Sequence, residues 1–349
     1  MMKAAVLHDV RDLRYQDMET PVPGAGEVLL RVRASGICGS DVPRVNAGAA
    51  HYYPIVLGHE FSGEIAALGE GVTGLSIGQR ATAAPLVPCM RCEDCQKGNY
   101  SLCKKYSFIG SSLFGSFAEY VKVPLQNVVT FDDSVSFIQG AFFEPATVAL
   151  HGLICADYRG GEDVAILGGG TIGLFTMQWA KLLGARRTVV FDISGERLEL
   201  ARRLGADEVI LTSEPDFLNR AAALTGGRGY GFVFETAGRI ETMHMAFETA
   251  ANKAGVCFIG TESRDVTFPW KLFEKMNRKE FRLTGSWMSY SPPFPGREWR
   301  MTADYFGRGL LKFDEALVYR KFPLADAAKA FQMYLEPGAV KGKLMLTMD

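Results

Sequence analysis

Four cysteines are crowded into one short loop, where they stand among charged and small residues as C-x2-C-x2-C-x7-C: Cys89, Cys92, Cys95 and Cys103. Four thiolates at this spacing can surround one tetrahedral Zn²⁺ without support from regular secondary structure. A set of four sulfur ligands leaves no position for a substrate. The pattern therefore predicts a structural zinc ion that fixes the loop.

The loop has two other interpretations besides a zinc site. An iron–sulfur cluster would need a shorter last gap followed by proline, whereas Cys103 is followed by Lys104. Four reduced free thiols within fifteen residues would serve no purpose that the spacing explains. The chain holds seven cysteines, an odd number, and in a reducing compartment such crowding favours a metal over disulfides.

A second group of possible ligands is dispersed along the chain. Cys38 lies in GICGSD, His59 and Glu60 lie in GHEF, and Glu144 lies in FFEP. Taken singly, a buried cysteine or histidine is more often a core residue than a ligand. Together, and beside a cofactor-binding pattern, they favour an open metal site. Gly63 stands where HExxH would need its second histidine, so the helical metalloprotease motif is absent.

The cofactor-binding pattern is the glycine run Gly168-Gly169-Gly170-Thr171-Ile172-Gly173, which follows an apolar strand and opens an amphipathic helix. In this context Gly168 permits the tight turn, Gly170 lets the backbone approach a pyrophosphate, and Gly173 allows close packing of helix on strand. Free N–H groups and the helix dipole would face the anion. Without that context the run would be an ordinary glycine turn.

An acidic residue ends the second strand of this region. Asp192 lies nineteen residues after Gly173, where its carboxylate can accept hydrogen bonds from the ribose hydroxyls of NAD and would repel the 2′-phosphate of NADP. A solvated strand end or a helix N-cap is the alternative for Asp192. Arg197 follows closely and could neutralise a phosphate instead, so the cofactor preference stays open at this point.

Alternating strands and helices must position the glycine run. Short β-branched runs predict six strands, at 164–167, 188–193, 208–211, 232–235, 256–260 and 282–287. Segments with helical spacing lie between them, at 171–184, 196–204, 217–224 and 242–252. This alternation is typical of a doubly wound α/β sheet.

The rest of the chain has a different pattern. Before residue 145, short strands such as 28–33, 63–68 and 118–123 are separated by glycine and proline turns, which predicts a mostly β domain. The last stretch contains the proline cluster Pro292, Pro293 and Pro295, then a helix-like segment and the strand-like 344–346. We expect domains at 1–145 and 146–285, with 286–349 returning to the first.

Bulk properties exclude several classes of partner. With 38 basic and 39 acidic side chains, the chain gives no reason to expect nucleic acid or an anionic membrane as a partner. The first ten residues lack the pattern of a secretory signal, and the most apolar region, 135–155, is interrupted by polar residues and proline. A cytoplasmic protein with a small-molecule substrate is expected.

The motifs occur together, and in this order, in one known family. GICGSD, GHEFSG, the four-cysteine loop, FFEPATVALHG and GGGTIG resemble the zinc-containing medium-chain alcohol dehydrogenases over essentially the whole chain. Glutamate at 144 resembles the polyol and sorbitol dehydrogenase branch. HYYPIVLGHEFSG and GSWMSYSPPFPGREW resemble, more narrowly, the galactitol-1-phosphate 5-dehydrogenases.

The resemblance implies a GroES-like domain made from both chain ends around a Rossmann domain, with NAD in the cleft between them. It implies two zinc ions per chain: a catalytic one held by Cys38, His59 and Glu144, and a structural one held by the four cysteines. Glu60 would support the ligands or replace one when substrate is absent. Family habit also implies a homodimer or homotetramer, paired through the edge strand 282–287.

Two positions depart from the family pattern. Pro43 stands where common alcohol dehydrogenases have a proton-relay histidine, so the proton would leave through Ser40 and then water or His51. Ser40 could equally be a turn residue that caps its neighbours. Leu113 and Phe114 stand where a sugar-phosphate enzyme would be expected to carry polar residues, which weakens the case for a phosphorylated substrate.

The sequence thus predicts hydride transfer between NAD and a secondary alcohol of a polyol or polyol phosphate. Weaker candidates for substrate contact are Arg44, His51, Tyr52, Trp287, Arg297 and Trp299. Alternatives are the same chemistry on an unphosphorylated polyol, L-threonine or a simple alcohol, a zinc-free quinone reductase, and a non-catalytic NAD-binding protein. Cys155 and Cys257 lie in apolar patterns and are expected to pack in the core.

Overall fold

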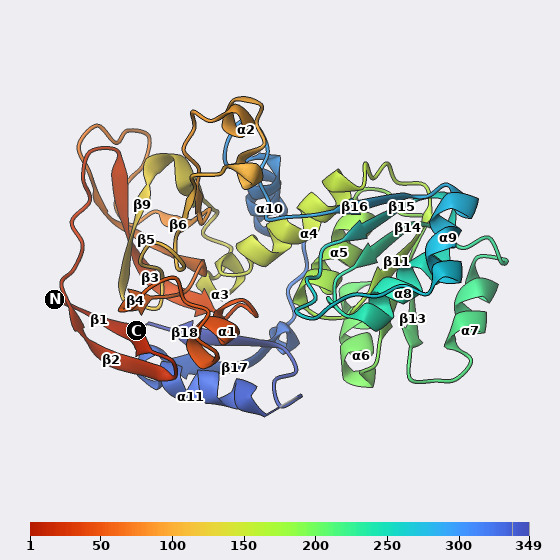
Figure 1. Ribbon diagram of the computed structural model, residues 1–349. Helices are drawn as coiled ribbons and strands as arrows, with labels where there is room; N and C mark the ends of the chain where they lie inside the picture. Colours follow the sequence, from red (N-terminus) through yellow and green to blue (C-terminus); the bar gives the residue numbers. More distant parts are fainter. Residues whose placement is uncertain (337, 349) are drawn as a thin grey trace. The chain divides into compact units, whose positions relative to one another are not determined.

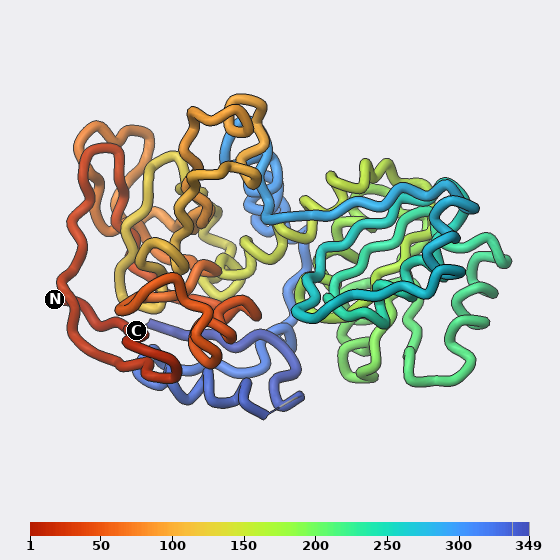
Figure 2. Tube along the Cα trace, in the orientation of Figure 1, coloured from red at the N-terminus to blue at the C-terminus, as the bar shows by residue number. Residues whose placement is uncertain are grey.

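The computed structural model describes residues 1–336 and 338–348 and divides into two compact units (Figures 1 and 2). Unit 1 comprises Met1–Glu144, Tyr290–Gly309 and Glu315–Asp349, and unit 2 comprises Pro145–Ser289 and Leu310–Asp314. Each unit has its own sheet system and its own apolar core.

Unit 1 is mostly β-structure. Its strands are β1 (Met2–Asp9), β2 (Asp12–Met18), β3 (Glu27–Gly36), β4 (Ile55–Val56), β5 (Glu60–Leu68), β6 (Arg80–Ala83), β7 (Leu86–Val87), β8 (Ser107–Phe108), β9 (Tyr120–Pro124), β10 (Val128–Thr130), β17 (Val318–Pro323) and β18 (Lys343–Thr347). Seven of them form one sheet in the order β10-β6-β5-β3-β18-β17, with β9 also paired to β3. The others form a three-stranded sheet β2-β1-β4 and the two-stranded pair β7-β8.

Short helices connect these strands. They are α1 (Asp41–Asn46), α2 (Glu93–Gln96), α3 (Phe137–Gly140), α10 (Arg297–Gly307) and α11 (Ala327–Gln332), with 3₁₀ turns at Tyr100–Leu102, Leu125–Asn127, Glu315–Leu317, Leu324–Asp326 and Met333–Leu335. The C-terminal strand β18 pairs antiparallel with β3, matching Met345 with Gly36. The end of the chain therefore lies directly beside the strand that leads into GICGSD.

Unit 2 contains a parallel six-stranded sheet in the order β13-β12-β11-β14-β15-β16. The strands are β11 (Asp163–Leu167), β12 (Arg187–Asp192), β13 (Glu208–Leu211), β14 (Tyr230–Glu235), β15 (Ala250–Phe258) and β16 (Arg282–Gly285). The helices are α4 (Phe143–Cys155), which begins in unit 1, then α5 (Thr171–Leu182), α6 (Gly195–Leu204), α7 (Phe217–Leu224), α8 (Ile240–Thr249) and α9 (Trp270–Lys279). This order confirms the predicted α/β fold, a Rossmann sheet joined to a mostly β, GroES-like part.

Two features of unit 2 correct the sequence interpretation. The helix expected at 242–252 ends at Thr249, and β15 starts at Ala250, earlier than expected. The cause is an irregularity in the strand, since the pairing with β14 shifts register near Lys253, which has a positive φ of 62°. Helix α9 was not predicted, although Pro269 marks its N-terminus.

Apolar side chains fill the two cores separately. In unit 2 the inward faces of β11, β12 and β14 contribute fully buried side chains such as Ala165, Val189 and Val233. Within residues 1–336 and 338–348, no helix has the length and apolar composition needed to cross a membrane.

Candidate active site and metal centres

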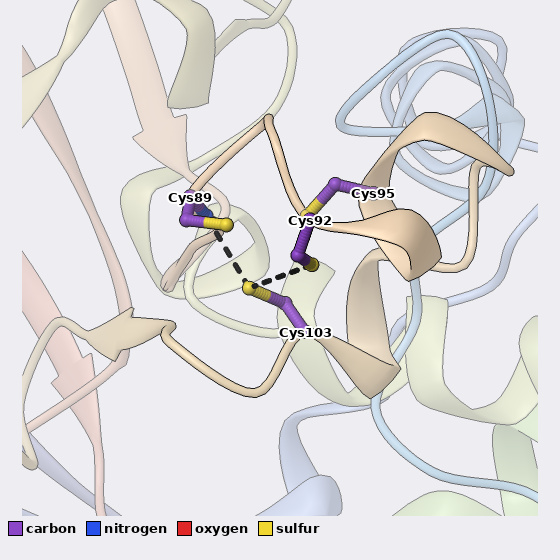
Figure 3. A group of neighbouring side chains, drawn as sticks. All are labelled: Cys89, Cys92, Cys95 and Cys103. Carbon is purple, nitrogen blue, oxygen red and sulfur yellow. Dashed lines mark hydrogen bonds between the residues drawn. The ribbon is translucent and has the colours of Figure 1, made fainter.

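The cysteine loop brings its four sulfur atoms together. In Figure 3, Cys89, Cys92, Cys95 and Cys103 converge from the loop between β7 and β8, and their sulfurs lie within 4.8 Å of one another. Cys103 Sγ lies 3.8 Å from Cys92 Sγ and accepts a hydrogen bond from the Cys89 N–H at 3.4 Å. The four side chains therefore form the closed sulfur set that tetrahedral zinc requires.

The pKa values of two of the four thiols show that the loop favours a bound cation. The backbone N–H groups of Arg91 and Cys92 lower the pKa of the Cys89 thiol to about 6. Burial, followed by the neighbouring sulfurs of Cys92 and Cys103, raises the pKa of Cys95 to about 12. Four crowded sulfurs cannot all ionise together unless a cation lies among them, so the donor set fits Zn²⁺.

A second ligand group lies on neighbouring strands. Cys38 follows β3, His59 precedes β5, and Glu60 opens β5, where it pairs with Gly36 in the β3–β5 ladder. Their ligand atoms lie within 4.8 Å of one another. Among the described residues, this group and the cysteine loop are the two clusters of three or more His, Cys, Asp or Glu side chains close enough to share an ion.

Asp41 contacts two members of this group, Cys38 and His59. It is fully buried, and its Oδ2 accepts a hydrogen bond from the Cys38 N–H at 3.0 Å. Its Oδ1 lies 3.5 Å from His59 Nδ1, which leaves Nε2 as the nitrogen available to a metal. A carboxylate behind a histidine in this way fixes the orientation of the ring, as is usual for metal-ligating histidines.

The charges around His59 suit a divalent cation. Burial alone would lower the pKa of His59, but the negative charges of Asp41 and Cys38 outweigh it and raise the pKa well above its usual value. His59 Nδ1 is buried 3.5 Å from Asp41 Oδ1, and Glu60 Oε2 is buried against Lys343 Nζ at 2.6 Å. An anionic pocket that would draw a proton onto a buried histidine is a pocket suited to a divalent cation.

Glu144 lies near this group but not within it. It stands in the first turn of α4 and does not belong to the cluster of close ligand atoms. Surrounding protein atoms raise the pKa of its carboxyl to about 7, with His59 opposing and Glu60 adding to the rise. Glu144 is thus electrostatically coupled to His59 and Glu60, while Glu60 occupies the place beside Cys38 that the sequence interpretation gave to Glu144.

Ser40 is exposed at the start of α1. Its Oγ accepts a hydrogen bond from Arg44 Nη1 at 2.9 Å, so its own proton is not used in that contact. Although Ser40 is the N-cap residue of α1, its side chain makes no capping hydrogen bond. The capping role considered for it is therefore not observed.

The glycine loop has the backbone geometry that a pyrophosphate needs. Gly168 has a φ of +113°, a conformation that favours glycine. A Cβ on Gly173 would collide with the Gly168 carbonyl oxygen, so glycine is required for α5 to pack against β11. Gly170 is the N-cap of α5, and a Cβ there would meet no atom within 4 Å, which leaves space in front of the helix N-terminus that Thr171 and Ile172 begin.

Asp192 closes the other side of this loop. Its Oδ2 accepts the Gly169 N–H at 2.7 Å and its Oδ1 accepts the Ser194 N–H at 2.8 Å. It is buried, and the N-cap of α6 is Ser194, so neither a solvated strand end nor a helix cap describes it. Arg197 Nη1 lies 3.8 Å from Asp192 Oδ2, so the carboxylate already has a cationic neighbour.

The weaker candidates for substrate contact differ in how far their side chains are exposed to solvent. Tyr52 and Trp287 are 40% and 54% exposed, and His51 and Arg297 are also exposed. Trp299 is fully buried and its ring stacks on Tyr290, with ring centroids 6.3 Å apart. The proposal that Trp299 contacts substrate is therefore wrong, because the side chain belongs to the core of unit 1.

Two residues of the site were missed in the sequence. Asp41 could have been found, because it closes GICGSD three residues after Cys38 and carboxylates commonly orient ligating histidines. Lys343, whose Nζ lies 2.6 Å from Glu60 Oε2, could not have been found. It is 283 residues away from Glu60 in sequence, and only the pairing of β18 with β3 brings it there.

Comparison with known proteins decides the family. Residues 24–133 match the family model for the alcohol dehydrogenase GroES-like domain, and residues 171–304 match that for zinc-binding dehydrogenase. Galactitol 1-phosphate 5-dehydrogenase of Escherichia coli (strain K12) is 41% identical over 311 residues, which cover 89% of this chain and 87% of the relative. The chain belongs to the zinc-containing medium-chain alcohol dehydrogenases.

Other relatives agree with this assignment. Sorbitol dehydrogenase of Bacillus subtilis (strain 168) is 35% identical over 76% of both chains. The crystal structure of galactitol-1-phosphate dehydrogenase from Escherichia coli superposes with a TM-score of 0.93 at 38% identity, covering 99% of this chain and 100% of that one. A zinc-binding dehydrogenase from Sinorhizobium meliloti 1021, solved with NADP, gives a TM-score of 0.90 at 30% identity, covering 100% and 99%.

The family membership confirms the predicted fold class and the enzyme class. This medium-chain dehydrogenase is a zinc-binding, NAD(P)-dependent enzyme of the group that acts on alcohols and polyols.

Proposed function

We propose that this protein oxidises a secondary alcohol of a polyol or polyol phosphate and passes the hydride to NAD. The observation that carries the proposal is the meeting of Cys38, His59 and Glu60 within 4.8 Å, with Glu144 coupled to them electrostatically. Cys38, His59 and Glu144 would hold the catalytic zinc. The four loop cysteines would hold a structural zinc.

When bound, zinc would favour the alkoxide form of the substrate and NAD would accept the hydride. The chain supplies the surroundings for this step. Cys38 as thiolate and Glu144 as carboxylate would balance the two positive charges of the ion, with His59 neutral. Asp41 keeps the His59 ring oriented from its buried position.

Ser40 is our candidate for receiving the alcohol proton. Its hydroxyl is exposed two residues after Cys38, and Arg44 donates to its oxygen at 2.9 Å. That contact orients the oxygen and leaves its hydrogen free to be passed on to water or His51. Glu60 would act as a supporting group or an alternate ligand.

The cofactor preference rests on Asp192. One carboxylate oxygen holds the glycine loop through the Gly169 N–H and the other accepts the N–H of Ser194 at the start of α6, and each oxygen retains a further lone pair for a ribose hydroxyl. A buried carboxylate at this place disfavours a 2′-phosphate, which supports NAD. Arg197 is the group that would favour NADP if it turned toward a phosphate.

A substrate panel tests the proposed reaction. Galactitol 1-phosphate, free galactitol, sorbitol, L-threonine and a simple secondary alcohol are offered with NAD and with NADP, and kcat/KM is measured for each. We expect a polyol or its phosphate to exceed the simple alcohol by at least about tenfold, because only the polyol supplies several hydroxyls to hydrogen-bond. Equal rates on simple alcohols, or a preference for L-threonine, would overturn the polyol assignment.

The zinc-free and non-catalytic alternatives make different predictions. A quinone reductase without zinc would stay fully active after metal removal, and a binding protein would take up NAD without turnover on any alcohol. The two clusters of metal-binding side chains, one with an exposed serine beside it, favour the zinc enzyme over both.

We also propose that the protein pairs through β16. This strand ends the sheet of unit 2, and among the described residues it pairs only with β15. Leu283 on the strand and Trp287 just beyond it are 38% and 54% exposed. Hydrodynamic mass should equal two or four chains, and in Leu283→Asp it should fall from two chains to one or from four chains to two. The control Val22→Asp, at a residue that is 80% exposed in unit 1, should leave it unchanged. A wild-type mass of one chain contradicts the proposal.

A further inference from the structure

A buried ion pair joins the C-terminal strand to the residue beside His59. Lys343 Nζ lies 2.7 Å from Glu60 Oε1 and 2.6 Å from Glu60 Oε2, so the ammonium contacts both carboxylate oxygens. The side chains are only 10% and 2% exposed. A charged pair this deep costs desolvation free energy, which suggests a role beyond general stability.

The same carboxylate contacts the ligand cluster. A Glu60 oxygen lies within 4.8 Å of ligand atoms of both Cys38 and His59. Glu60 therefore stands between two cationic partners, the ammonium of Lys343 and whatever cation the cluster holds. The Glu60 carboxylate can therefore move toward Lys343 or toward the cation of the cluster.

The backbone fixes Lys343 in this position. Its Nζ also donates to the carbonyl of Ile37 at 3.3 Å, next to Cys38, and the Ile37 N–H donates to Leu344 O at 2.9 Å. Gly36 makes room for the pair, since a Cβ there would collide with Glu60 Oε2 and lie 3.4 Å from Lys343 Cδ. Strands β3, β5 and β18 thus hold the lysine beside the cluster.

We propose that Lys343 is a positioning residue that keeps the Glu60 carboxylate from occupying the place the substrate hydroxyl needs. This inference rests on the proposed function. With Cys38 and Glu144 balancing the charge of a zinc ion, the ion does not need Glu60 as a third anionic ligand. Lys343 offers the Glu60 carboxylate another cationic partner and so competes with the metal for it. Without the ammonium, Glu60 has the metal as its remaining cationic partner.

The test replaces Lys343 with methionine, which keeps the length of the side chain and removes its charge. Three quantities are measured: the rate at which a chelator extracts the catalytic zinc, the visible absorption spectrum after Co²⁺ replaces that zinc, and kcat on the best substrate of the panel. In Lys343→Met we expect slower zinc extraction, a changed cobalt spectrum and a kcat at least about tenfold lower. Lys343→Arg should restore all three toward wild type, and Lys341→Met, at an exposed lysine two residues earlier, should change none.

A double variant separates positioning from folding. In a Glu60→Gln background the amide is a poor metal ligand, and adding Lys343→Met removes the ammonium that the amide leaves without its carboxylate partner. Lys343→Met should therefore no longer change zinc extraction or the cobalt spectrum in this background. Unchanged extraction and spectrum in Lys343→Met, or weaker zinc retention, would overturn the proposal whatever happens to the melting temperature. Because both metal readouts need no substrate, they remain decisive if the panel rejects polyols.

Discussion

Replacing Cys38 with serine is expected to lower kcat on the best polyol substrate by more than about 100-fold while the protein stays folded. Removing groups that merely support metal ligands typically costs roughly 10- to 100-fold, so the loss of a ligand should cost more. Cys38 is only partly buried and lies beyond the end of β3, which is why its replacement should spare the core. Steady-state kinetics and circular dichroism together check this result.

The matched control for this prediction is Cys155→Ser. Cys155 ends α4 and, among the described residues, belongs to neither cluster of metal-binding side chains. It should keep turnover within about threefold of wild type, since the thiol-to-hydroxyl exchange is small and Cys155 lies at the opposite end of α4 from Glu144. Comparable losses in both variants would mean that Cys38 acts only through packing.

Replacing Cys103 with serine is expected to destabilise the protein strongly while affecting catalysis less. Cys103 is 2% exposed and contacts both the Cys89 N–H and Cys92 Sγ, so its loss opens the sulfur cluster. The loop that it anchors packs Tyr100 against Phe294, with ring centroids 5.2 Å apart. A loss of about 3 kcal/mol or more is expected for a broken metal site, which corresponds to a fall of roughly 6 °C or more in the apparent melting temperature.

Thermal unfolding with and without a chelator checks the origin of this loss. Wild type should fall toward the Cys103→Ser melting temperature when the structural zinc is stripped, whereas the variant should respond little. Lys104→Ala, at the exposed neighbour of Cys103, serves as the control and should melt like wild type. A variant as stable as wild type, still losing stability on chelation, would show that the cysteine loop does not hold the ion.

Much of the fold could be predicted because its signals are local. The glycine run predicted a tight turn and a helix start, and the structure has Gly168 at positive φ and α5 beginning at Thr171. Likewise the cysteine spacing needs no long-range information, and its four sulfurs do converge. The predicted boundary between a helix and the following strand was wrong where strand pairing overrides helical spacing, as at the start of β15 near Lys253.

The active site could be predicted only in part because its geometry depends on distant pairing. The Cys38 and His59 motifs come together through the pairing of β3 with β5. The sequence pattern could suggest that these strands pair, but it could not give the register of the pairing. Lys343 reaches Glu60 through the return of β18, a contact invisible to motif analysis. Among the described residues, Glu60 rather than Glu144 has a ligand atom within 4.8 Å of those of both Cys38 and His59, which the motifs alone did not indicate.

The most direct measurement is the zinc content of the folded chain, by native mass spectrometry, in wild type and in two double variants. The account predicts two ions per chain in wild type, matching the two clusters. It predicts one ion in Cys38→Ser/His59→Ala and one in Cys92→Ser/Cys103→Ser. Two ions retained by Cys38→Ser/His59→Ala would show that these side chains do not hold the ion on which the proposed chemistry depends.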